Sequence, residues 1–219
     1  ARGEGENLQG GGVNLTAEEL LALVQGSPEW SAARVGYSTS SEFSSILAKG
    51  QGKTRAAYLR RIVCERLTGK PMETYATGSW AKSLERGTEQ EPYARMAVEA
   101  KLGVMVQEVG IIRHDSLMAS CSCDGLIGDD AGCEIKSVIP TVQLETILAG
   151  GFPPEHKPQI FGNLWLSKRK AWYFCSFCPD MPEHLRLYVS RVERDDAYIR
   201  TLEAEVKVFL DEVDYLCDK

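Results

Sequence analysis

Two acidic residues and a lysine, spaced along a predicted β-hairpin, are the residues of this chain best suited to chemistry. They lie in CSCDGLIGDDAGCEIKSV, where two strand-like runs, 117–127 and 133–138, flank a turn rich in glycine and aspartate. A hairpin centred on this turn places Asp124 opposite Glu134, with Cβ atoms roughly 5 Å apart. Carboxylates this close repel each other unless one is protonated or a cation lies between them, and their oxygens suit Mg²⁺ or Mn²⁺.

Lys136 adds a cation to this pair, because side chains alternate along a strand and Lys136 therefore shares a face with Glu134. A metal held by the carboxylates would lower the pKa of a bound water, and the ammonium group could orient that water or stabilise charge on a phosphate. The pattern therefore indicates metal-assisted attack on a phosphate group. The alternative is a hairpin with solvent-exposed charges, because Asp followed by Glu-x-Lys also occurs by chance.

A third carboxylate, Glu91, is predicted on the inward face of a helix over residues 79–102. Apolar residues recur there at helical spacing, and Glu91 lies seven residues from both Leu84 and Val98. A carboxylate on an inward face is costly unless it is paired or binds a cation. Glu91 could therefore join the hairpin carboxylates in a metal site, or form an ion pair with Arg95, one turn further along the helix.

The rest of the sequence predicts a mixed α/β protein in which helices flank a central mixed sheet. We expect one domain over residues 13–219, preceded by a glycine-rich tail over residues 1–12 that is disordered or a remnant of cloning. Helices are expected from Thr16 and Ser27 and over 41–48, 54–69, 79–102, 141–149, 158–167 and 195–216, and strands over 104–113, 117–127, 133–138, 171–177 and 185–192.

Composition limits the class of protein. The 219 residues, 43% hydrophobic and 26% charged, are ordinary for a soluble globular protein. The net charge of −6 disfavours a protein that coats nucleic acid by bulk electrostatics, but it allows a nuclease with separate acidic and basic clusters. No apolar run reaches the ~18 residues that a membrane span needs, and no signal peptide opens the chain, so we expect no membrane contact.

Seven cysteines cannot all pair internally, so we expect reduced thiols. The pairs Cys121–Cys123 and Cys175–Cys178 have spacings that would allow a zinc or iron–sulfur site. Buried thiols that pack as small apolar groups are the favoured interpretation.

Four segments together resemble the phage lambda exonuclease family, the YqaJ-type alkaline exonucleases of the PD-(D/E)XK nuclease superfamily. In chain order they are WSAARVGYSTSSEFSSIL, RGTEQEPYAR, CSCDGLIGDDAGCEIKSV and PQIFGNLWLSKRKAWYF. The resemblance implies a restriction-endonuclease-like fold and a Mg²⁺-dependent enzyme, with Mn²⁺ as a substitute. Such an enzyme degrades one strand of linear double-stranded DNA from its 5′ end and leaves a 3′ single strand for annealing-type recombination.

The same resemblance implies a ring-shaped homotrimer with DNA in its central channel. It also implies a single-strand annealing protein as a partner, and the cytoplasm of a bacterium or of a phage-infected host cell as the location.

Matched by position, the resemblance assigns catalytic roles to five residues. Asp124, Glu134 and the backbone carbonyl of Ile135 would hold the metal. Lys136 would contact the attacking water, and Glu91 would support the region of a second metal.

Five further residues match positions that bind DNA or complete the active site. Arg34 and Ser41 match a pocket for the terminal 5′ phosphate, and Glu108 matches another active-site acid. Gln159 matches one end of a glutamine motif whose second glutamine is absent here. Leu84 matches an apolar wedge that helps to part the strands, although core packing would also explain it.

Two other functions stay open at this point. One is an endonuclease or a single-strand repair nuclease of the same superfamily, which would share the metal residues but lack the phosphate pocket. The other is a non-catalytic protein that binds DNA ends through a vestigial site. The pair Arg34 and Ser41 argues against the first, and the complete set Asp124, Glu134 and Lys136 argues against the second.

Overall fold

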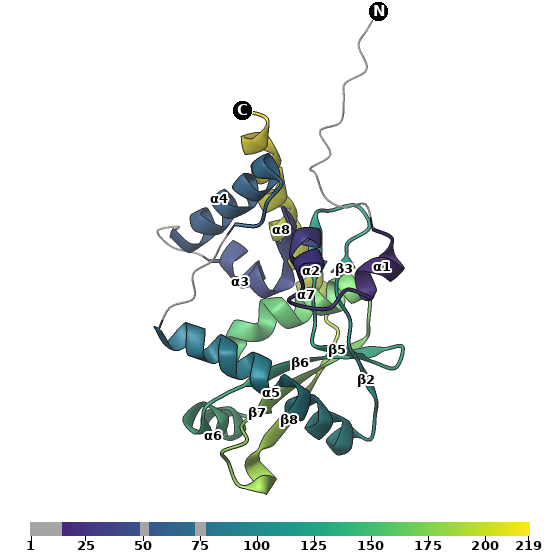
Figure 1. Cartoon of the computed structure of the whole chain (residues 1–219), viewed down its shortest axis with the longest axis vertical. Coiled ribbons are helices and arrows are strands. Elements are labelled where there is room, and N and C mark those ends of the chain that lie inside the picture. Colours follow the sequence, from purple (N-terminus) through teal and green to yellow (C-terminus); the bar gives the residue numbers. More distant parts are fainter. Residues whose placement is uncertain (1–14, 49–52, 73–77) are drawn as a thin grey trace, which may run out of the picture.

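Two β-sheets and the helices that enclose them form the fold (Figure 1). The computed structural model describes residues 15–48, 53–72 and 78–219, with the backbone alone for 79–81, 83 and 84. The expected tail over residues 1–12 therefore lies outside the described residues. Helices and strands of both parallel and antiparallel pairing confirm the predicted mixed α/β class. No helix within the described residues is long and apolar enough to cross a membrane.

The helices of the first half begin and end close to the predicted positions, because their limits are set by local signals. Thr16 and Glu19 form the predicted capping box at the start of the first helix. Ser27 caps the second through the N–H of Trp30 at 3.1 Å, and Gly69, with φ of +65°, follows the fourth. These elements are α1 (Ala17–Leu21), α2 (Pro28–Ala33), β1 (Ser38–Thr39), the 3₁₀ turn η1 (Ser40–Glu42), α3 (Phe43–Ile46), α4 (Lys53–Thr68) and α5 (Gly78–Leu102).

The predicted strands over 104–113 and 117–127 are each divided between the two sheets, which corrects the sequence-based prediction. The smaller sheet has the order β1-β4-β3 and the larger one the order β2-β5-β6-β7-β8. The strands concerned are β2 (Val106–Gln107), β3 (Ile112–Arg113), β4 (Ala119–Cys121) and β5 (Gly125–Ile127).

A tertiary contact causes the first division. The N–H groups of Gly110 and Ile111 donate to the carbonyl oxygens of Leu21 and Leu20, each at 2.9 Å. The end of α1 thus takes the backbone hydrogen bonds that a continuous strand would give to a neighbouring strand, and the chain passes from one sheet to the other at this point.

The β5–β6 hairpin has the predicted register. Gly125 lies opposite Cys133 and Ile127 opposite Ala131, so the turn is centred on Asp129 and Asp124 comes next to Glu134 along the hairpin. Strand β6 (Ala131–Ser137) then pairs in parallel with β7 (Ala171–Phe177), which pairs antiparallel with β8 (Leu187–Glu193).

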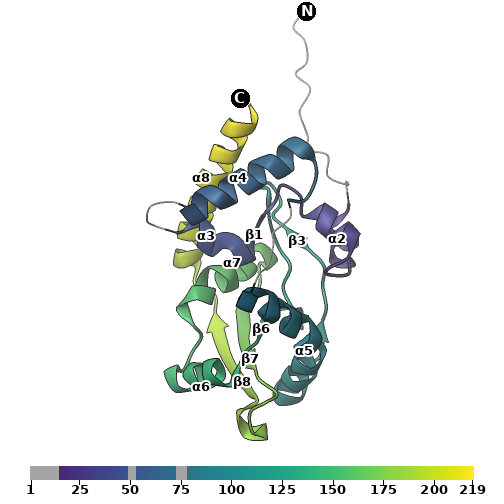
Figure 2. The same ribbon diagram turned by 60° about the vertical axis from the view of Figure 1, so that its left-hand side comes forward.

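Helices cover both faces of the larger sheet (Figure 2). Ala94 and Val98 of α5 pack on the face that carries Cys133, Ile135 and Cys175. The opposite face shares one hydrophobic core with α3, α4, α7 and α8, and α4 lies along α8 where the C-terminus leaves the molecule. The remaining helices are α6 (Pro140–Ala149), η2 (Pro154–His156), α7 (Lys157–Ser167), η3 (Glu183–Leu185) and α8 (Asp196–Cys217).

All seven cysteines are free thiols. Cys64 is exposed and Cys217 is partly exposed, whereas the other five are buried, four of them on or beside the strands of the hairpin and its neighbour β7.

Candidate active site

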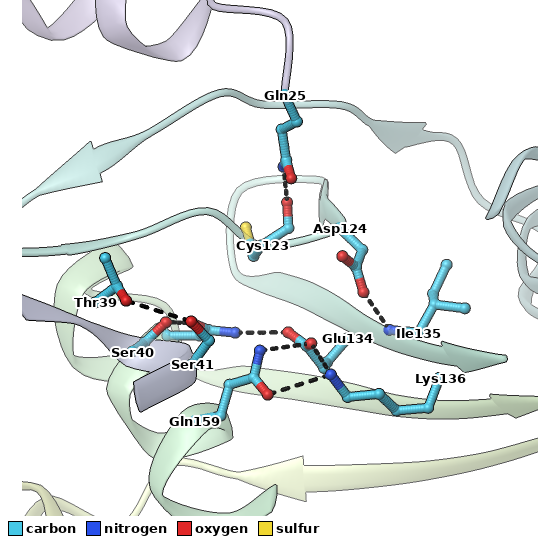
Figure 3. A network of polar contacts seen from close by, with 11 residues as sticks. Gln25, Thr39, Ser40, Ser41, Cys123, Asp124, Glu134, Ile135, Lys136 and Gln159 are labelled. Atoms are coloured by element: carbon cyan, nitrogen blue, oxygen red, sulfur yellow. Dashed lines mark hydrogen bonds and ion pairs between the residues drawn. The ribbon is translucent and has the colours of Figure 1, made fainter. Parts of the chain in front are cut away.

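Asp124 occupies the edge of β6 that β5 leaves open. The pairing of β5 with β6 stops at Gly125 and Cys133, so the N–H of Ile135 has no strand partner on that side. Asp124 supplies the partner instead, because its Oδ2 accepts a hydrogen bond from the Ile135 N–H at 2.5 Å (Figure 3). The N–H and C=O of a strand residue leave the same edge, so the Ile135 carbonyl also faces the Asp124 side.

Glu134, the residue before Ile135, directs its side chain toward Gln159 and Asn163 of α7 and is 2% exposed. Its Oε1 accepts hydrogen bonds from Lys136 Nζ at 2.8 Å and from Gln159 Nε2 at 2.6 Å. Its Oε2 accepts one from Asn163 Nδ2 at 3.0 Å. A carboxylate this buried and this well provided with donors excludes the alternative of a hairpin with solvent-exposed charges.

The electrostatics of the site follow from the carboxylates of Asp124 and Glu134 and the ammonium group of Lys136, which are largely shielded from solvent. Burial, and then the charge of Glu134, raise the pKa of Asp124 well above its ordinary value. Burial alone would lower the pKa of Lys136, but the charges of Glu134 and Asp124 outweigh it and hold that pKa above its ordinary value. Lys136 is therefore a cation at any pH near neutrality.

Glu91 lies half-buried on α5 and lines the same cavities as Asp124. Burial raises the pKa of Glu91 most, while Arg95 opposes the shift and the charges of Glu108 and Glu134 add to it. The alternative role for Glu91 was an ion pair with Arg95. Arg95 instead pairs with Glu108, at 2.8 Å. Glu108 follows β2 rather than lying on it. Its side chain is 70% exposed and lines one of the cavities that Glu91 and Asp124 line.

A cavity of about 790 Å³ lies between α5, the end of β6 and α6. Asp124, Glu91 and Lys136 line it on the side of the hairpin. Lys82 and Arg86 of α5 line it as well, so the cavity offers positive charge to an anionic ligand beside the carboxylates.

Arg34 and Ser41, which the family resemblance places in one pocket, both line a separate cavity of about 300 Å³. The guanidinium carbon of Arg34 stacks 4.0 Å from the ring centroid of Trp30. Burial lowers the pKa of Arg34 from its ordinary value, and no described residue accepts a hydrogen bond from its guanidinium group. Thr39 and Arg61 line the same cavity.

A family model of the YqaJ-like viral recombinase domain matches residues 29–170, well over half of the chain. The chain belongs to the YqaJ-like viral recombinase family. This confirms the resemblance found in the sequence. A search of curated protein sequences gave no match.

Solved structures agree with this assignment. The YqaJ-like chain is similar to an alkaline exonuclease, LHK-Exo, from Laribacter hongkongensis, with 34% identity and a TM-score of 0.80 over 88% of this chain and 95% of that one. A structure of LHK-Exo in complex with dAMP gives 33% identity, the same TM-score and the same coverage. A phage-related exonuclease from Haemophilus somnus 129PT, 14% identical with a TM-score of 0.63 over 83% and 95% of the chains, shares the fold. Family membership supports a role as a DNA exonuclease.

Two residues of the YqaJ-like site were missed in the sequence. Asn163 contacts Glu134, and Ser40 Oγ donates to Asn163 Oδ1 at 2.6 Å. The available signal was an amide side chain within the apolar run of α7, placed one helical turn after Gln159 and therefore on the same face. Gln159, matched by resemblance to a glutamine motif, contacts the same cluster, with its Oε1 3.3 Å from Lys136 Nζ.

The remaining predictions for this YqaJ-like chain concern metals and Leu84. Among the described residues, no group of three His, Cys, Asp or Glu side chains is arranged to hold a metal ion. A metal at Asp124 and Glu134 would therefore need a third donor of another kind, such as the Ile135 carbonyl. Leu84 belongs to α5, but its side chain lies outside the described residues, so neither the wedge nor the core role is tested.

Proposed function

We propose that this protein is a Mg²⁺-dependent exonuclease that degrades one strand of linear double-stranded DNA in the 5′-to-3′ direction. The observation that carries the proposal is the convergence of Asp124, Glu134 and Lys136 at the open edge of β6, beside a cavity with basic walls. The similarity to the alkaline exonuclease LHK-Exo supports it independently.

The residues at this edge fit a small divalent cation. Carboxylate and carbonyl oxygens are the donors that Mg²⁺ and Mn²⁺ prefer. No described donor reaches Oδ1 of Asp124, and the raised pKa of Asp124 means that a nearby positive charge would relieve the cost of its ionised form. Asp124, Glu134 and the Ile135 carbonyl would hold the ion, with Glu91 beside them. Once bound, such an ion supplies a nucleophilic water at neutral pH and offsets charge on a phosphate.

Lys136 contributes charge that does not depend on any bound ion. Its ammonium group is held by Glu134 Oε1 at 2.8 Å and lies 3.3 Å from Gln159 Oε1. A group fixed in this way loses little freedom when a phosphate arrives, and it can donate its remaining hydrogen to an attacking water or to a phosphate oxygen. Because Lys136 stays protonated, it acts as a hydrogen-bond donor and a positive charge, not as a base.

The proposed direction of digestion depends on the pocket of Arg34 and Ser41. A terminal phosphate carries more negative charge than an internal one, so a guanidinium group without a protein acceptor favours it. The Ser41 hydroxyl, 3.3 Å from that of Thr39, offers a further hydrogen bond. A duplex end held here by its 5′ phosphate would present its first linkages to the hairpin carboxylates.

The proposal extends to the assembly and the setting that the family implies. It includes a ring-shaped homotrimer around DNA, strand separation assisted by Leu84, and a single-strand annealing protein that takes the 3′ strand. It also includes action in the cytoplasm of a bacterium or of a phage-infected host. These parts are supported by the family alone.

End-labelled DNA tests the proposed function. We expect a linear duplex with 5′ phosphates to release its 5′ label first as mononucleotides in Mg²⁺, and a covalently closed circle to survive. EDTA should stop all degradation. Cutting of the circle would make the protein an endonuclease, degradation in EDTA would refute the metal role, and binding of ends without degradation would favour the non-catalytic alternative.

A further inference from the structure

A buried chain of hydrogen bonds joins the wall of the phosphate pocket to Glu134. Ser40 Oγ donates to Asn163 Oδ1 at 2.6 Å, and Asn163 Nδ2 donates to Glu134 Oε2 at 3.0 Å. Ser40 is 2% exposed and Asn163 is fully buried. Ser40 also stands between Thr39 and Ser41, which both line the pocket (Figure 3). Ser40 of η1 therefore connects the segment that lines the pocket to Asn163 of α7.

The chemistry of the partners fixes the orientation of the Asn163 amide. An ionised carboxylate can only accept hydrogen bonds, so the amide NH₂ must face Glu134. The amide oxygen then faces Ser40, whose hydroxyl has to donate to it. Without that hydroxyl, the amide oxygen would be buried without a donor, and nothing would hold the NH₂ group against Glu134.

The segment that carries Ser40 has no room to move independently of α7. Its neighbour Thr39 is held through its N–H by the Tyr58 hydroxyl at 3.0 Å, and the Ser38 N–H donates to the Met118 carbonyl at 2.9 Å. At Gly162, directly before Asn163, an added Cβ would lie 3.0 Å from the Ser40 Cβ. The tight packing of Ser40 on Gly162 and its hydrogen bond to Asn163 would let a displacement at Ser41 reach α7.

We propose that Ser40 and Asn163 are positioning residues that couple a terminal phosphate in the Arg34–Ser41 pocket to the metal-binding orientation of Glu134. This inference rests on the proposed function, because it takes Glu134 as a metal ligand and the pocket as the phosphate site. Coupling of this kind is reciprocal, so the phosphate raises metal affinity by the same factor by which the metal raises phosphate affinity.

The test is the metal affinity of Ser40→Ala, measured with and without DNA. Ser176→Ala is the matched control, because Ser176 is also fully buried and donates to an amide oxygen, Gln143 Oε1, at 2.6 Å. Mn²⁺ binding is measured by calorimetry, alone and with a duplex that has phosphorothioate linkages to resist hydrolysis and either a 5′ phosphate or a 5′ hydroxyl. Steady-state rates on ordinary duplexes are measured in parallel.

We expect the 5′-phosphorylated duplex to raise Mn²⁺ affinity by about fivefold or more in the wild type and in Ser176→Ala. In Ser40→Ala this gain over the 5′-hydroxyl duplex should disappear, and kcat on 5′-phosphorylated ends should fall by about tenfold or more without a matching rise in KM. A merely structural role for Ser40 would lower the melting temperature of Ser40→Ala and leave its gain in metal affinity unchanged.

The outcomes separate this inference from the function on which it rests. If the wild type shows no metal-dependent degradation, the proposed function fails. If the wild type is active but its metal affinity does not respond to the 5′ phosphate, or if Ser40→Ala keeps the full response, the coupling alone is refuted. Should Ser40→Ala not fold, Asn163→Leu is used in its place. It keeps the branched shape of the side chain, removes its polar atoms and carries the same expected loss.

Discussion

Gly162 of α7 packs directly against Phe43 of α3, and Gly162→Ala should disturb the site through this contact. An added Cβ would lie 2.6 Å from Cδ2 and 2.7 Å from Cε2 of Phe43, whereas carbon atoms in contact prefer about 3.5–4.0 Å. Phe43 is fully buried, so its ring cannot turn aside without displacing its neighbours. The substitution should therefore push α7 away from α3 by roughly 1 Å.

Two opposing energies set the size of the effect. Alanine stabilises a helix interior by about 0.8–1 kcal/mol relative to glycine, and overpacking costs about 1–3 kcal/mol. The net loss is at most about 2 kcal/mol, and in a chain of this length each kcal/mol lowers the melting temperature by about 2–4 °C. Asn163 moves with Gly162, and a misplacement of this size can lower the rate about a hundredfold.

The assay combines thermal unfolding with kcat on a linear duplex in Mg²⁺. Gly87→Ala is the control for stability, because Gly87 also lies in a helix but nothing lies within 4 Å of its added Cβ. Gly87→Ala should raise the melting temperature, while Gly162→Ala lowers it. Adding Phe43→Leu to Gly162→Ala makes room for the methyl group and should recover part of the lost activity.

Two results would refute this reasoning. One is a Gly162→Ala protein that melts at or above the wild-type temperature with unchanged kcat, since α7 would then not need its close approach to α3. The other is strict additivity of Gly162→Ala and Phe43→Leu, since residues in contact should couple.

Three further predictions concern the proposed catalytic and binding residues. Lys136→Met should lower kcat about a hundredfold or more and leave DNA affinity in EDTA nearly unchanged, and near-normal turnover would make Lys136 an ordinary strand lysine. Asp124→Asn should raise the melting temperature of the metal-free protein at neutral pH, because the raised pKa of Asp124 makes its ionised form costly to the fold. That gain should vanish as the pH falls below about 4, where the carboxyl is protonated in both folded and unfolded chains, and a lower melting temperature in EDTA at pH 7 would contradict it. Arg34→Ala should narrow the difference in rate between 5′-phosphorylated and 5′-hydroxyl duplexes. Arg60→Ala, which removes an exposed arginine of the neighbouring α4, should leave this difference unchanged. Equal rates on both kinds of end in the wild type would exclude the phosphate pocket.

Features fixed by neighbours in the chain could be predicted from the sequence. The turn residues around Asp129 determine the hairpin register, and this register alone places Asp124 at the edge of β6 beside Ile135. Caps such as the box of Thr16 and Glu19 set helix starts in the same local way. The juxtaposition of Arg34 with Ser41 was available through family resemblance, because their separation in the chain says little about a shared cavity.

Features that depend on distant segments could not be predicted. Strand β1 has two residues and exists because β4 pairs with it in parallel, so it leaves no periodicity in the sequence. The division of residues 104–113 depends on carbonyl groups at the end of α1. Ser40 and Asn163 are 123 positions apart, and each is unremarkable until α7 packs against η1.

The buried thiols make it possible to measure how often the sheets of this fold open. Burial raises the pKa of Cys175 to about 12, and it raises that of Cys121 and Cys133 as well, so these thiols form no reactive thiolate while the sheets stay closed. Cys64 is exposed and reacts without any opening. A thiol reagent should therefore modify the protein in a fast and a slow phase, and the slow phase measures the free energy of separating the strands that carry the carboxylates. This measurement needs neither DNA nor metal, so it can follow the integrity of the site in proteins that have lost all activity.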